Sequence, residues 1–341
     1  MNPPGPAGPY RKQTLLEERM TMVEQSDFTR LTGGYRGELL AYCYRMTGSA
    51  HDAEDLVQEV YLRAWRSYGS FEGRSSLRTW LYRIATNACL NALGHSSRRV
   101  LPSGLSGPLG DPDRLPPRAH DLPWLEPFPD AALTDADPAV IVAARSDLRL
   151  ALVAALQNLP VRQRAILILR DVLSWSAAEV ATFLDTTPVA VNSGLQRARV
   201  RLERLSAAPG DLAEPSDPRG RDLLDRFVSA FEAADLTALA ALLTEDVTWE
   251  MPPNPAWFAG RDAVLRLVAS RWPGVPGGAR LLPTTANSQP AAGMYVLDGG
   301  GAYRPHSLKV LTVTPAGIRC VHAFHSPELF PAFGLPDVLR P

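Results

Sequence analysis

The sequence has 341 residues, 45% of them hydrophobic, which is enough for two or three domains with separate cores. Its net charge of -1 at pH 7 excludes a protein coated with basic charge, so any DNA-binding surface must be local. Three widely spaced cysteines, with no stretch typical of a signal peptide or a membrane span, predict a cytoplasmic protein with no membrane partner.

Proline divides the chain into modules. Nine prolines fall between residues 98 and 138, too many for a helix or a central strand, and a second break follows residue 206. The predicted organisation is a disordered tail (1–19), a helical domain (20–97), a proline-rich linker (98–138), a second helical domain (139–206), a short linker (207–218) and a third domain (219–341).

The first domain is helical by its apolar residues, which recur at steps of three and four. Ser49 and Asp52 form a capping box for a helix through Trp65, and another helix begins at Ser75 or Ser76. Acidic residues cluster between residues 52 and 59, and arginines mixed with aromatic residues follow between residues 60 and 99. Such charge runs are usually solvated helix faces and most of the rings must be core, but the mixture also suits melted nucleic acid.

The second domain contains a predicted helix-turn-helix. Ser176 and Glu179 form a capping box for a short helix ending near Leu184, and Thr187 caps a final helix with Pro188 in its first turn. A helix pair of this kind is structural about as often as it binds DNA. The arginines near the end of the final helix favour a recognition helix that enters a major groove.

Two blocks of these domains resemble a known family. Residues 52–65 (Asp-Ala-Glu-Asp-Leu-Val-Gln-Glu-Val-Tyr-Leu-Arg-Ala-Trp), with Phe71 and residues 79–87, resemble region 2 of extracytoplasmic-function sigma factors. Residues 158–164 and 191–199 resemble their region 4. The resemblance implies binding to core RNA polymerase, at the beta-prime clamp and beta flap, and promoter-specific initiation of transcription on promoter DNA.

The resemblance also implies the residues that make these contacts. Those on the polymerase are Asp55, Leu56, Gln58 and Glu59. Those on the -10 element are Ser67, Phe71, Arg78, Arg83 and Asn87, where an aromatic face and an amide suit a flipped base. Those on the -35 element are Arg162, Arg164, Asn192, Ser193, Gln196, Arg197 and Arg199. Asn192 and Gly194 replace residues that are commonly basic in the family, which predicts an unusual -35 sequence or a weaker grip.

The third domain is predicted to have helices followed by a curved antiparallel sheet. The expected strands lie near residues 247–251, 280–287, 292–298, 306–314 and 317–325. Residues 243–253 and 257–263 resemble the SnoaL-like, polyketide-cyclase-like branch of the cone-shaped fold of nuclear transport factor two. The predicted fold class is therefore multidomain, with two all-α sigma domains and a C-terminal α+β cone-shaped domain.

No catalytic set stands out in this third domain. Its possible acid-base groups are Asp246, Glu250, Asp298, His306, His322 and His325, and no pair has a spacing that compels a role. His322 and His325 stand three apart on an expected strand and so on opposite faces, which argues against a shared metal. We predict no enzyme activity, no cofactor and no metal, and a regulatory domain with a possible small-molecule ligand.

Three hypotheses stay open from the sequence. The first is a sigma factor whose C-terminal domain modulates its activity. The second is a ligand-responsive helix-turn-helix regulator that does not depend on sigma activity, which leaves the acidic helix and the block around Asn87 unexplained. The third is an isomerase, cyclase or hydrolase fused to a DNA-binding module. Dependence on polymerase separates the first two, and turnover of a small molecule would be needed for the third.

Overall fold

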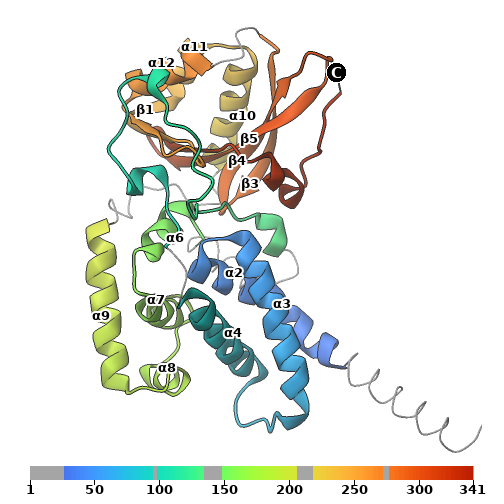
Figure 1. Cartoon of the computed structure of the whole chain (residues 1–341), viewed down its shortest axis with the longest axis vertical. Coiled ribbons are helices and arrows are strands. Elements are labelled where there is room, and N and C mark those ends of the chain that lie inside the picture. The colour runs from blue at the N-terminus through green and yellow to red at the C-terminus, as the bar shows by residue number, and fades with distance from the viewer. Residues whose placement is uncertain (1–26, 95–97, 134–147, 206–217, 272–275, 341) are drawn as a thin grey trace, which may run out of the picture.

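The computed structural model describes residues 27–94, 98–133, 148–205, 218–271 and 276–340 (Figure 1). Two helical domains lie at one end of the molecule and a helix-and-sheet domain at the other (Figure 1). The predicted tail 1–19 and most of the short linker, residues 207–217, fall outside the described residues. Within the described part, no helix combines the length and the apolar character that a membrane span requires.

The first domain is a bundle of helices, as predicted. Its elements are η1 (Gly33–Tyr35), α2 (Arg36–Thr47), α3 (Ala50–Ser67), η2 (Tyr68–Ser70) and α4 (Leu77–Leu93). The Ser49 hydroxyl accepts the amide of Asp52 at 3.0 Å and so caps α3. Ser76 caps α4 in the same way. These bonds satisfy amides that a helix start leaves without partners, and they confirm both predicted starts.

The second domain contains the predicted helix-turn-helix. Its elements are α6 (Leu150–Gln157), α7 (Val161–Leu167), the π-helical turn η6 (Ile168–Val172), α8 (Ala177–Phe183) and α9 (Pro188–Leu205). The capping box of Ser176 and Glu179 is present at the start of α8. A Cβ atom on Gly194 would lie 2.9 Å from the Cδ1 atom of Ile166, so the glycine allows α9 to approach α7 closely.

The third domain packs helices on one face of a six-stranded sheet. Its elements are α10 (Pro218–Glu232), α11 (Leu236–Leu242), β1 (Leu243–Glu250), β2 (Trp257–Ala259), α12 (Arg261–Arg271), β3 (Ala279–Ala286), β4 (Gln289–Leu297), β5 (Tyr303–Thr314), β6 (Gly317–Phe324) and η8 (Pro327–Phe333). The strand order is β2-β1-β6-β5-β4-β3. The predicted sheet was wholly antiparallel, but β1 and β6 run parallel. The long connection through α12 and four strands (β2 to β5) makes that pairing possible.

The two faces of the sheet meet different partners. Leu311 and Val321 pack with the helices of the same domain. Val310, one residue before Leu311, and Phe324, three residues after Val321, point to the opposite face and belong to a core shared with the sigma domains. Helices α10, α11 and α12 therefore cover one face, and the other face is turned toward the sigma domains (Figure 1).

The proline-rich linker lies along the third domain (Figure 1). Residues 98–133 form 3-10 turns, η3 (Pro102–Gly104), η4 (Pro112–Arg114) and η5 (Asp130–Leu133), and no α-helix. The amide of Leu109 donates to the carbonyl of Trp257 at 2.8 Å, and the amide of Ala119 donates to that of Pro253 at 3.0 Å. Backbone hydrogen bonds therefore bind the linker to the third domain.

Candidate functional site

Helix α3 carries an acidic, partly exposed face. Asp55 and Gln58 are exposed, and Glu59 is half-buried with its carboxylate 2.6 Å from Arg63. Leu56, predicted to contact polymerase, is only 6% exposed because it packs into the core of the bundle. This placement argues against a direct contact by Leu56, and the polar residues around it form the available surface.

Aromatic and polar side chains gather at the start of α4. The ring of Phe71, in the loop before the helix, lies 4.9 Å from the ring of Trp80, centroid to centroid. Trp80, Arg83 and Asn87 follow at steps of three and four and so share one face of α4, with Arg83 and Asn87 exposed. Ser67, at the end of α3, donates its hydroxyl to the carbonyl of Arg63 at 2.7 Å. The arrangement offers a ring face, a cation and an amide on one surface.

Arg78 is held by a buried carboxylate. Its guanidinium lies 2.8 Å from Oε2 of Glu38, which is 6% exposed and also accepts the hydroxyl of Tyr82 at 3.2 Å. A buried carboxylate needs such partners to offset its lost hydration. Arg78 therefore stabilises the bundle, which argues against its predicted contact with the -10 element.

Helix α9 has the two faces of a recognition helix. Val191, Leu195 and Ala198 are buried against the domain. The exposed side carries the predicted contacts Asn192, Ser193, Gln196, Arg197 and Arg199. The guanidinium of Arg199 is occupied by Asp171 of η6, with N–O distances of 2.6 and 2.9 Å.

The other two arginines predicted at the -35 element differ in placement. Arg162 is exposed and donates to the carbonyl of Leu184 at 2.8 Å. Arg164 is only 3% exposed and donates to the carbonyl of Met46 in the first domain and to Oε1 of Gln157 at 2.6 Å. Burial lowers the pKa of Arg164 to about 10. This placement argues against a DNA contact by Arg164, which instead joins the two helical domains.

One turn of the third domain reaches both helical domains. Asn287 and Ser288 connect β3 to β4, both with φ of 55°, as a tight two-residue hairpin requires. Asn287 is 0% exposed. Its amide nitrogen donates to the hydroxyl of Tyr44 at 2.8 Å and to the carbonyl of Leu148 at 2.6 Å, and its oxygen accepts the amide of Phe128 at 2.8 Å. A single side chain therefore ties together the first domain, the linker and the segment that precedes α6.

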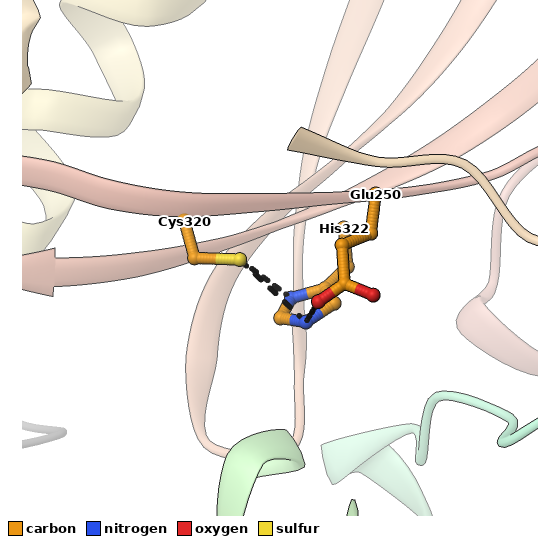
Figure 2. A group of neighbouring side chains, drawn as sticks. All are labelled: Glu250, Cys320 and His322. Atoms are coloured by element: carbon orange, nitrogen blue, oxygen red, sulfur yellow. Dashed lines mark hydrogen bonds and ion pairs between the residues drawn. The ribbon is translucent and has the colours of Figure 1, made fainter. Parts of the chain in front are cut away.

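A second cluster lies on the sheet beneath the linker, where Glu250, Cys320 and His322 point toward one another (Figure 2). Nε2 of His322 lies 3.6 Å from Oε1 of Glu250 and 3.6 Å from Sγ of Cys320. Ser103 of the linker donates its amide and its hydroxyl to the two oxygens of Glu250, each at 3.0 Å. Burial opposes the charged form of His322, yet Cys320 and Glu250 raise its pKa to about 10.

The opposite face of the sheet holds a buried lysine. Nζ of Lys309 lies 5.2 Å from the ring centroid of Phe231 and 5.1 Å from that of Trp249. Burial lowers the pKa of Lys309 to about 7. The rings of His306 and His325 are in edge-to-face contact, with their centroids 5.0 Å apart. Burial and the charge of Lys309 lower the pKa of His306 to about 4 and that of His325 to about 2.

Three family matches follow the order of the domains. Residues 31–99 match Sigma-70 region 2, residues 149–202 match Sigma-70 region 4, and residues 224–325 match the SnoaL-like domain. The chain is 50% identical over 317 residues to the ECF RNA polymerase sigma factor SigG of Mycobacterium tuberculosis, a match that covers 92% of this chain and 85% of SigG. The chain belongs to the extracytoplasmic-function (ECF) sigma factors of RNA polymerase.

A second sigma factor of the same organism has a similar chain and fold. SigJ is 28% identical over 302 residues, which cover 86% of this chain and 88% of SigJ. Its crystal structure superposes with a TM-score of 0.57 at 26% identity, over 91% of this chain and 99% of that chain. Both relatives are named as RNA polymerase sigma factors, which decides for the first hypothesis over a regulator that does not depend on sigma activity.

The sequence did not predict which residues of this sigma factor the fold brings together. Cys320 and His322 are two residues apart on β6, so their side chains lie on the same face of the sheet. Their partner Glu250 lies on β1, 70 residues before Cys320, and that distance hides the cluster from the sequence. Lys309 is one of two lysines among the 35 lysine and arginine residues of the chain. This rarity could have drawn attention to it from the sequence alone. Asn287 carried no signal beyond its high frequency in turns.

Proposed function

We propose that this ECF sigma factor opens promoters with the surface formed by Phe71, Arg83 and Asn87. A flipped base of the -10 element would stack on the Phe71 ring and offer its edge to the amide of Asn87, while Arg83 binds phosphate. The common face of α4 and the contact between Phe71 and Trp80 support this arrangement.

Two further surfaces complete the proposed initiation complex. The polar face of α3, with Asp55, Gln58 and Glu59, docks on the clamp of core polymerase. The exposed side of α9, joined by Arg162, contacts the -35 element, where each bidentate base contact contributes about 1–3 kcal/mol of discrimination. The exposed positions on α9 support this assignment. Arg199 must exchange Asp171 for DNA in that complex.

We propose that the C-terminal domain modulates initiation by fixing the two sigma domains relative to each other. The observation that carries this proposal is Asn287, whose side chain bonds to Tyr44, to Leu148 and to the linker at Phe128. A cavity of about 890 Å³ lies at the same junction, between α2, the linker and η8. A small molecule bound there would contact all three parts and shift the balance between closed and open arrangements.

Run-off transcription with bacterial core polymerase and a panel of promoters tests both proposals. We expect promoter-specific transcripts from the full chain, and their loss in the variant that combines Phe71→Ala with Asn87→Ala. Asn91→Ala is the matched control, because Asn91 is exposed on the same helix one turn further from Phe71. Transcription by the double variant at the level of the wild type would contradict the proposed -10 surface.

The modulating role needs separate variants. Asn287→Ala in the full chain, and a chain ending at Ala207, remove the junction without changing the DNA-binding residues. A change in promoter use by both variants supports modulation, whereas transcription identical to that of the full chain contradicts it. Because the -10 variant and the junction variants are scored on the same promoters, either proposal can fail alone.

A further inference from the structure

The side chains of Glu250, Cys320 and His322 have the chemistry of a metal site. They offer a carboxylate oxygen, a sulfur and an imidazole nitrogen, and these ligand atoms all lie within 4.8 Å of one another. They come from two adjacent parallel strands, with Glu250 paired directly to His322 and Cys320 two residues earlier on the same face. The pairing of β1 and β6 thus fixes their relative positions.

The distances fit a tetrahedral ion of the zinc class. Bonds of about 2.0 Å to nitrogen or oxygen and about 2.3 Å to sulfur, at tetrahedral angles, separate neighbouring ligand atoms by about 3.3–3.6 Å. Nε2 of His322 lies 3.6 Å from Sγ of Cys320 and 3.6 Å from Oε1 of Glu250. The same sulfur also lies 3.5 Å from Nδ1, so the imidazole ring must turn to direct the Nε2 lone pair at an ion held between the three ligands. Soft sulfur combined with imidazole and one carboxylate favours zinc and similar transition metals over magnesium or calcium.

The linker supplies the next layer of the site. The amide of Ser103 holds Oε2 of Glu250 at 3.0 Å, which leaves Oε1 directed at His322 (Figure 2). The hydroxyl of Ser103 donates to Oε1 at 3.0 Å, so it lies next to the proposed ligand atom. Partners that orient a coordinating carboxylate contribute to affinity in known metal sites. Glu250 and His322 are 5% and 4% exposed and Cys320 is partly exposed, so the site is mostly buried.

We propose that Glu250, Cys320 and His322 bind a zinc-class metal ion and that Ser103 of the linker closes the site. The ion would join η3 of the linker to β1 and β6 of the C-terminal domain, and so couple metal supply to the segment that runs between the two sigma domains. The inference rests on the geometry of the C-terminal domain and of the linker at Ser103, so it holds or fails independently of the proposed promoter contacts.

Cobalt titration of the purified full-length protein is the direct test, because Co²⁺ takes the same ligands and absorbs light. We expect one equivalent to give intense tetrahedral d–d bands and a thiolate-to-cobalt charge-transfer band, both removed by added Zn²⁺. Cys320→Ser should abolish the charge-transfer band while the buried Cys43 and Cys89 remain in place. Glu250→Gln, which keeps the size of the side chain, should weaken binding. Melting curves of the metal-free variants establish that each one folds.

His51→Gln is the matched control for His322→Gln, because His51 is an exposed histidine on α3, in the first domain. His51→Gln should leave the titration unchanged and His322→Gln should remove it. Ser103→Ala should weaken cobalt binding about 10- to 100-fold, as changes to orienting partners do. Spectra unaffected by Cys320→Ser and His322→Gln would overturn the site. Unchanged affinity in Ser103→Ala would overturn the closing role of the linker.

Discussion

The side-chain amide of Asn287, in the turn between β3 and β4, donates a hydrogen bond to the hydroxyl of Tyr44 on α2 at 2.8 Å. The two residues are separated by 243 positions in the chain and by the whole of the second domain. Tyr44 is 0% exposed and its hydroxyl in turn donates to the carbonyl of Glu126 in the linker. The C-terminal domain is thus joined to the first domain through polar groups that water does not reach.

Asn287→Ala should loosen this junction selectively. The substitution leaves the amide of Phe128 and the carbonyl of Leu148 without that partner, at a cost of about 1–3 kcal/mol for each buried group. We expect faster hydrogen exchange in the linker around Phe128 and a lower melting temperature. Asn254→Ala, which removes one bond of 3.3 Å to the linker at Pro116, is the control and should change exchange around Phe128 little.

Asp171→Asn should strengthen promoter binding. Asp171 holds Arg199 on the exposed side of α9, and its neutralisation frees a guanidinium for a phosphate or a base. We expect tighter binding to -35 DNA. The slope of the logarithm of the binding constant against the logarithm of the salt concentration should become steeper by about one. Asp225→Asn makes the same change of charge at an exposed position of α10 and should leave the slope unchanged. A gain that persists in the combination of Asp171→Asn with Arg199→Ala would contradict this account.

Arg164→Met should lower thermal stability, whereas Arg162→Met should weaken binding to promoter DNA. Removing the buried Arg164 leaves the carbonyls of Met46 and Gln157 short of a donor, at about 1–3 kcal/mol for each, so the melting temperature should fall. Removing the exposed Arg162 should leave melting nearly unchanged and weaken binding to promoter DNA. Thermal melting and filter binding on both variants separate the two roles. A stable Arg164→Met variant with weak DNA binding would restore the contact predicted from the sequence.

The sequence predicted the helix starts well because each start depends on residues that are close in the chain. The starts of α3, α4 and α8 follow from hydroxyl groups that accept amides three residues later, and this needs no tertiary structure. The alternating strands β3 to β6 were also expected near their observed bounds. The parallel pairing of β1 with β6 was not, because register between distant strands is set by packing.

The residues predicted to bind DNA divide in the same way. Exposure of Asn87 and Arg197 agrees with their position on an amphipathic helix, whose polar face the sequence reveals. Arg78 and Arg164 carry the same charge but bind groups of the protein itself. Arg78 binds Glu38, 40 residues away, and Arg164 binds the carbonyl of Met46 in the first domain, 118 residues away. A motif alone does not separate an arginine that binds DNA from one that binds its own protein.

Lys309 should make the stability of the C-terminal domain rise with pH. Burial lowers its pKa from 10.5 to about 7, so between these values the unfolded chain holds a proton that the folded chain does not. Raising the pH through this window therefore favours folding, by up to about 1.4 kcal/mol per pH unit, and below it the full cost of the buried charge remains. The ionisable neighbours that interact with it, His306 and His325, stay neutral here, because their pKa values are lowered to about 4 and about 2.

Lys309→Met should remove this rise and stabilise the domain at pH 6, and the measurement is urea unfolding across pH 6 to 9. Lys12→Met, at the other lysine of the chain, is the control and should keep the slope. Labelling lysine with ¹⁵N gives a second test, since two lysines give two side-chain signals. The signal of Lys309 should titrate near pH 7. A Lys309 signal that titrates near 10.5 instead would mean that water reaches Lys309 between the sheet and α10.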